Sequence, residues 1–188
     1  LEFRRVLFRS KIIDNKENAI HELKRISNRT NSEKNTKINA IVEAILQDVK
    51  NFGDIAVEKY TKKFDGFNPN PMKVSENDLK DAWDEIDINL KRSLEVAHER
   101  ITKFHEKEIP SSFSIRGQHG DSVQRRWRPV KNAGIYIPGG RAAYPSTVLM
   151  NSIPAKVAGV KEILMVSPGD KEGRINKTVL AAAYLSEI

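Results

Sequence analysis

The stretch from Gly134 to Gly159, GIYIPGGRAAYPSTVLMNSIPAKVAG, contains the residues whose types and spacing best fit ligand chemistry. A short apolar run ends at Pro138, Gly139 and Gly140, and a helical pattern follows. The proline fixes the direction of the turn, and the two glycines allow left-handed backbone angles or the close approach of a ligand. Free N–H groups in this turn and at the start of the helix suit a phosphate or carboxylate. Tyr136, at the end of the apolar run, can place its ring or hydroxyl against such a ligand.

The same residues also have a purely structural explanation. A Gly-Gly pair after a strand is often only a tight turn, the pattern is not G-x-G-x-x-G, and no P-loop lysine follows. A single tyrosine such as Tyr136 is more often a core or rim aromatic residue. The spacing alone therefore allows ligand binding at Tyr136, Pro138, Gly139 and Gly140 but does not require it.

Candidate metal ligands and nucleophiles are few. The chain has no cysteine, which excludes disulfides, thiolate metal sites and cysteine nucleophiles. Its four histidines form no pair with metal-site spacing, and we expect them on helix faces or at the surface. They are His21, His98, His105 and His119.

Two strand–helix repeats are predicted to position the turn. A buried strand over residues 133–137 precedes a helix over 146–157 with Ser146 as its N-cap, and a strand over 162–166 precedes a final helix over 175–185. Strands and helices that alternate in this way predict a parallel sheet within an α/β layer. Pro154 lies inside the first of these helices and predicts a bend over residues 150–153.

The preceding part of the chain reads as mostly helical. Apolar residues at helical spacing between 38 and 49 predict a strongly amphipathic helix, with Ser32 as N-cap and Gly53 at its end. A weak helix over residues 11–29 precedes it. A short helix over 54–64 follows it.

Two further helices are marked by their caps. Ser75 with Asp78 forms a capping box, and Asp87 caps a helix that Pro110 closes. Residues 122–130 predict an edge strand anchored by Val123 and Trp127, because a proline there cannot donate to a ladder.

The predicted fold class is α/β. A helical N-terminal segment, residues 11–130, leads into the start of a Rossmann-like, NAD-binding parallel α/β domain, residues 131–188. Two parallel strands make a poor sheet, so we expect this domain to be incomplete. Residues 1–10, LEFRRVLFRS, have no helical or strand period and are interpreted as a non-native leader.

Charge and hydropathy argue against a nucleic-acid-binding, a membrane or a secreted protein. The formal charge is +7, of which residues 1–10 contribute +2, and the remaining lysines alternate with acidic residues as on a solvated surface. We therefore expect no nucleic-acid partner. No apolar run approaches the roughly 18 residues of a membrane helix, and no secretory signal is evident. We expect no membrane partner and a cytoplasmic location.

The whole segment from Gly134 to Gly159 resembles the signature region of histidinol dehydrogenases. The similarity extends to the stretches ILQDVKNFGD at 45–54 and YTKKFD at 60–65, and to Arg128-Pro129-Val130 leading into the turn. It covers the sequence from about Lys34 onward. A block of this length is far more specific than a Gly-Gly pair.

The resemblance implies an enzyme. Such proteins oxidise L-histidinol to L-histidine through an aldehyde with two NAD, the last steps of histidine biosynthesis. It further implies a homodimer in which zinc holds the substrate and a glutamate–histidine pair does the acid–base work. Tyr136 would contact NAD at a turn shaped by Pro138, Gly139 and Gly140. Family members are more than twice as long, so we expect catalytic and zinc-binding residues beyond Ile188 and no activity from this fragment alone.

Two other readings stay open at the level of sequence. One is a basic nucleic-acid-binding module that uses the cluster Arg125, Arg126, Trp127 and Arg128. The other is a phosphate- or sugar-binding α/β protein that uses the Gly139-Gly140 turn without redox chemistry.

Overall fold

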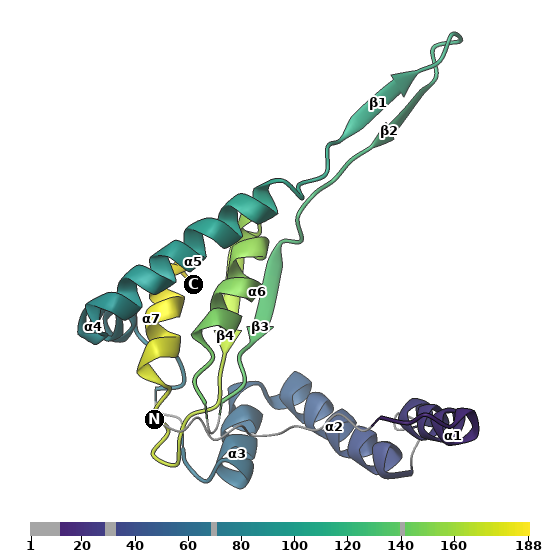
Figure 1. The fold of residues 1–188 in the computed structure, drawn as a ribbon. Coiled ribbons are helices and arrows are strands. Elements are labelled where there is room, and N and C mark those ends of the chain that lie inside the picture. The colour runs from purple at the N-terminus through teal and green to yellow at the C-terminus, as the bar shows by residue number, and fades with distance from the viewer. Residues whose placement is uncertain (1–11, 29–32, 69–70, 140–141) are drawn as a thin grey trace. The chain divides into compact units, whose positions relative to one another are not determined.

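The computed structural model of the chain describes residues 12–28, 33–68, 71–139 and 142–188 (Figure 1). It falls into two compact units, one up to Val57 and one from Glu58 onward. The expected leader at residues 1–10 and the predicted N-cap Ser32 lie outside the described residues.

The first unit is helical. Helix α1, Lys16–Ser27, begins after Asn15, whose side chain accepts hydrogen bonds from the N–H groups of Glu17 and Asn18. Helix α2, Glu33–Phe52, ends at Gly53, as predicted. The apolar stripe of α2 is about half exposed, with values of 46–58% for Ile38, Ile41, Val42 and Leu46.

Helix α3, Asp54–Phe64, runs across the division between the units. In the second unit, α4, Glu76–Glu85, begins with the predicted capping box. The Ser75 Oγ accepts from the Asp78 N–H at 3.1 Å, and the Ser75 N–H donates to Asp78 Oδ2 at 3.2 Å. Helix α5, Ile88–Glu106, begins at Asp87, which caps it as predicted.

Strands β1, Phe113–Arg116, and β2, Ser122–Arg125, form an antiparallel hairpin in which Phe113 lies opposite Arg125. The predicted strand over 122–130 is therefore too long. Val123 and Trp127 do not anchor it, because they are 68% and 48% exposed. Both strands are exposed along their length, since the hairpin pairs only with itself among the described residues.

The parallel sheet is formed by β3, Asn132–Tyr136, and β4, Glu162–Val166. Asn132 lies opposite Glu162 at one end of the pair, and Tyr136 lies opposite Val166 at the other. Helices α6, Pro145–Val157, and α7, Lys177–Leu185, lie on one face of this pair (Figure 1). The predicted strand–helix repeat and the α/β fold class are confirmed.

Helix α6 begins differently from the prediction. Pro145 occupies its first turn, Tyr144 is the N-cap residue, and Ser146 lies inside the helix. A proline at this position has the helical φ already set and lacks only an N–H that has no partner in the helix. The helix continues through Pro154 to Val157. The bend over residues 150–153 stays a prediction.

The core of the second unit lies where β3, α6 and α7 meet. Ile135 and Ile137, from β3 and its continuation, are buried in one core cluster with Leu149 and Ile153 of α6. Helix α4 packs on α7, and α5 packs on α6, so helices from both sides of residue 130 share this core. The predicted domain boundary at residue 130 rests on the change of element type and stays a prediction. The other buried members of the core are Ile86, Leu94, Val148, Val179, Ala181, Ala182 and Ala183.

Candidate functional site

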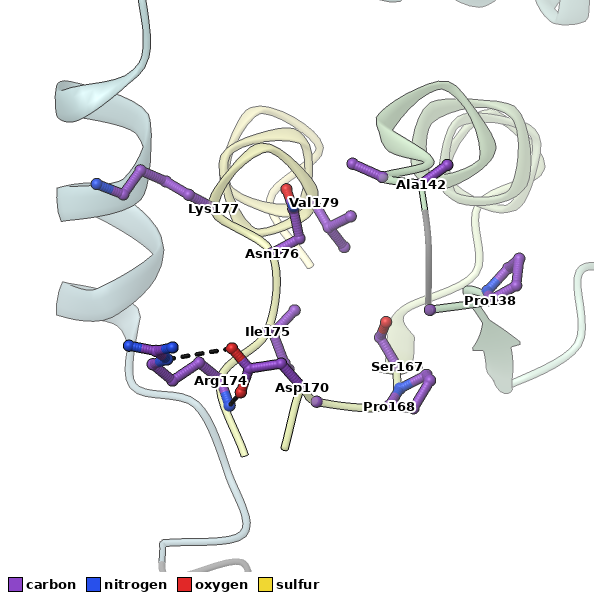
Figure 2. A pocket seen from close by; sticks show the side chains of 13 residues that line it. Pro138, Ala142, Ser167, Pro168, Asp170, Arg174, Ile175, Asn176, Lys177 and Val179 are labelled. Atoms are coloured by element: carbon purple, nitrogen blue, oxygen red, sulfur yellow. Dashed lines mark hydrogen bonds and ion pairs between the residues drawn. The ribbon is translucent and has the colours of Figure 1, made fainter. Parts of the chain in front are cut away.

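A cavity of about 350 Å³ lies at the carboxyl ends of β3 and β4, beside the first residues of α7 (Figure 2). Ligands of open α/β sheets bind at this edge, because the loops that leave the strands converge there. The cavity is lined by Pro138, Gly139, Ala142, Ala143, Ser167, Pro168, Gly169, Asp170, Arg174, Ile175, Asn176, Lys177 and Val179.

The alternation of side chains along β3 creates this edge. Ile135 and Ile137 are buried toward α6, and the Ile137 N–H donates to the Val166 carbonyl at 2.9 Å. The chain is thereby held against β4 to the point where it turns at Pro138. The two parallel strands end side by side, so their following loops face each other across the cavity.

The two loops lie so close together at residue 139 that only glycine fits there. A Cβ built on it would lie 2.6 Å from Pro168 Cγ and 2.9 Å from the Pro168 carbonyl oxygen. Its φ is not in the left-handed range, so close approach explains this glycine and backbone handedness does not. Gly140 lies outside the described residues.

Tyr136 lies on the other face of the sheet from the buried residues of β3. Its neighbours Ile135 and Ile137 are buried, whereas Tyr136 is 64% exposed. It does not line the cavity, although Pro138 and Gly139 do. The structure thus brings two of the predicted site residues into the cavity and places Tyr136 at the same strand end, with its side chain on the face that α6 and α7 do not cover.

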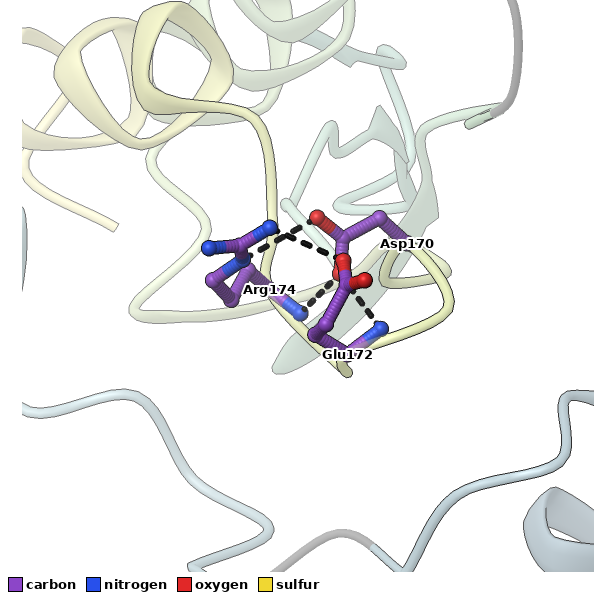
Figure 3. Close-up of polar contacts among 3 residues, drawn as sticks. All are labelled: Asp170, Glu172 and Arg174. Atoms are coloured by element: carbon purple, nitrogen blue, oxygen red, sulfur yellow. Dashed lines mark hydrogen bonds and ion pairs between the residues drawn. The ribbon is translucent and has the colours of Figure 1, made fainter.

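The loop from β4 to α7 adds charged groups that the sequence reading missed (Figure 3). Asp170 Oδ1 accepts from the N–H groups of Glu172 and Arg174 at 2.9 and 2.8 Å, and its Oδ2 accepts from Arg174 Nε at 3.1 Å. Arg174 Nη2 also donates to Glu172 Oε2 at 2.8 Å. Asp170 and Arg174 line the cavity, and Glu172 is bound to Arg174 beside them; we call these three residues the rim cluster.

Hydrogen bonding between Asp170 and Arg174 stabilises the charged forms of both groups. The N–H of Arg174 is the largest cause that lowers the pKa of Asp170, and the guanidinium of the same residue lowers it further. The hydrogen bond to Asp170 in turn raises the pKa of Arg174. Asp170 is therefore ionised at neutral pH, and with Glu172 it gives the cluster a net negative charge.

The start of α7 forms another wall of the cavity. Asn176 caps the helix, and its Oδ1 accepts from the Thr178 N–H at 2.9 Å and from the Thr178 hydroxyl at 2.7 Å. Lys177 is directed away from the cavity in Figure 2 and forms an ion pair with Glu85 of α4. The only sequence signal for this wall was the expected helix start near residue 175.

The histidines take no part in the cavity. Nδ1 of His105 lies 2.5 Å from Glu108 Oε2 near the end of α5, in a different part of the unit. Across the described ranges, no group of three or more histidine, aspartate or glutamate side chains is arranged to hold a metal ion.

The basic cluster at residues 125–128 is partly engaged within the chain. The Arg125 guanidinium lies 4.8 Å from the centre of the Trp127 ring, and Arg126 donates to Gln124. These contacts are short-range ones within the hairpin and its immediate continuation.

Within the described residues, no helix is long and apolar enough to cross a membrane.

Comparisons with known proteins all lead to one family. The family model described as histidinol dehydrogenase matches residues 28–188. Histidinol dehydrogenase of Prochlorococcus marinus strain MIT 9312 is 82% identical over 178 residues, which are 95% of this chain and 40% of that protein. The protein of the same name from Parasynechococcus marenigrum is 43% identical over 187 residues, which are 100% of this chain and 43% of that protein.

A solved structure gives the same result. The crystal structure of histidinol dehydrogenase from Elizabethkingia anophelis matches with a TM-score of 0.75 and 38% identity, over 80% of this chain and 35% of that one. The chain thus spans about 40% of the length of the curated relatives that it matches. None of these matches favours the nucleic-acid-binding alternative.

Proposed function

This chain belongs to the histidinol dehydrogenase family, and we propose that it is the N-terminal part of an enzyme that oxidises L-histidinol to L-histidine. The reaction passes through the aldehyde and uses two NAD, in the last steps of histidine biosynthesis. The match of residues 28–188 to the family model carries this proposal, and the cavity at the strand ends supports it independently.

The chain's part in the reaction, in this proposal, is to bind and orient NAD. The bound NAD would accept the hydride. Pro138 and Gly139 line the cavity at the carboxyl end of β3, which is the edge where open α/β sheets bind dinucleotides. The N-terminus of α7 adds backbone N–H groups next to the same space. Together these features support a dinucleotide at the carboxyl ends of β3 and β4.

Tyr136 is proposed to contact NAD from the end of β3. Its exposed side chain leaves the ring and hydroxyl accessible to a ligand. It precedes Pro138 by only two residues, so an extended dinucleotide that passes over the strand end can reach both faces. Gly140 is assigned to the same turn from the sequence resemblance.

The zinc ion that the resemblance implies has no ligand set in the described part of the chain. We therefore assign no step to it here. We propose that the zinc ligands and the glutamate–histidine pair are supplied by protein outside this sequence. We further propose that the complete enzyme is a cytoplasmic homodimer.

The test uses a complete protein that contains this sequence. Purified with zinc, it should form NADH from NAD only when L-histidinol is added, and it should lose this activity on chelation. The 188-residue chain by itself should show none. A folded, complete protein that forms no NADH with histidinol and zinc would overturn the proposal.

A further inference from the structure

We draw no further inference here: the strongest candidate, the apolar cavity of about 310 Å³ that His105, Trp127 and Arg128 line between the end of α5, the segment before β3 and the end of α6, carries nothing because no contact among the described residues shows what covers it.

Discussion

Gly139 and Pro168 meet so closely that the two loops of the cavity fit together only because residue 139 has no side chain. A Cβ at position 139 would lie 2.6 Å from Pro168 Cγ and 2.9 Å from its carbonyl oxygen. The second of these contacts involves backbone, which cannot move aside as a flexible side chain can. Gly139 therefore determines how closely the loops after β3 and β4 approach each other, and with that the shape of the cavity.

Gly139→Ala should therefore open or distort the cavity. We expect a loss of about 1–3 kcal/mol in the free energy of unfolding, as for other overpacked positions, together with weaker NADH binding. Thermal denaturation and NADH titration measure the two effects. Gly134→Ala is the matched control, because nothing lies within 4 Å of a Cβ built there, and it should leave both quantities nearly unchanged. A Gly139→Ala variant as stable and as tightly binding as the parent would contradict this contact.

Tyr136→Ala should separate binding from stability. The side chain is 64% exposed, so its removal should change the free energy of unfolding by less than about 0.5 kcal/mol. The proposed contact with NAD predicts instead a clear loss of NADH affinity. Leu164→Ala, on the same face and 68% exposed, should change neither quantity appreciably. Unchanged NADH affinity in Tyr136→Ala would remove this residue from the proposed site.

Local signals in the sequence predicted the elements around the site well. The strand over 162–166 was predicted at its observed bounds, and the capping box at Ser75 and Asp78 was confirmed. Both depend on residues close together in the chain, where periodicity and side-chain-to-backbone hydrogen bonds decide the structure. The predicted start of α6 was wrong. Ser146 was expected to be the N-cap, but Pro145, whose φ is already helical, occupies the first turn.

The lining of the candidate cavity could be predicted only in part. Pro138 and Gly139 were identified from the turn, but Asp170 was not, since Ser-Pro-Gly-Asp indicates only a loop. Asp170 lines the cavity because parallel pairing brings the end of β4 beside the end of β3, and pairing is a long-range property. The side of the sheet on which Tyr136 lies was likewise decided by which face α6 and α7 cover.

The pH dependence of stability should report on Asp170. Its pKa is lowered in the folded chain, mainly by the N–H of Arg174, so its ionised form stabilises the fold at pH values above the ordinary range for aspartate, about 3.9. That contribution is lost as the pH falls through the lowered pKa. Asp170→Ala should therefore lower the melting temperature at neutral pH, and the difference from the parent should shrink in acid. A difference that is constant across pH would show that the carboxylate charge is not involved.

Leu149 and Met150 are consecutive residues of α6 in opposite environments, which gives a test of the core beneath the cavity. Leu149 is 0% exposed among the core residues of β3 and α7, whereas Met150 is 64% exposed. Leu149→Ala should destabilise the chain by about 2–5 kcal/mol, since it removes buried methyl groups and leaves a void. Met150→Ala should lower the free energy of unfolding by less than about 0.5 kcal/mol. Denaturant unfolding of both variants measures the difference, and equal costs would show that α6 does not pack on the sheet through this face. Because α6 joins β3 to β4, Leu149→Ala should also weaken NADH binding by loosening the strand ends, whereas Met150→Ala should not.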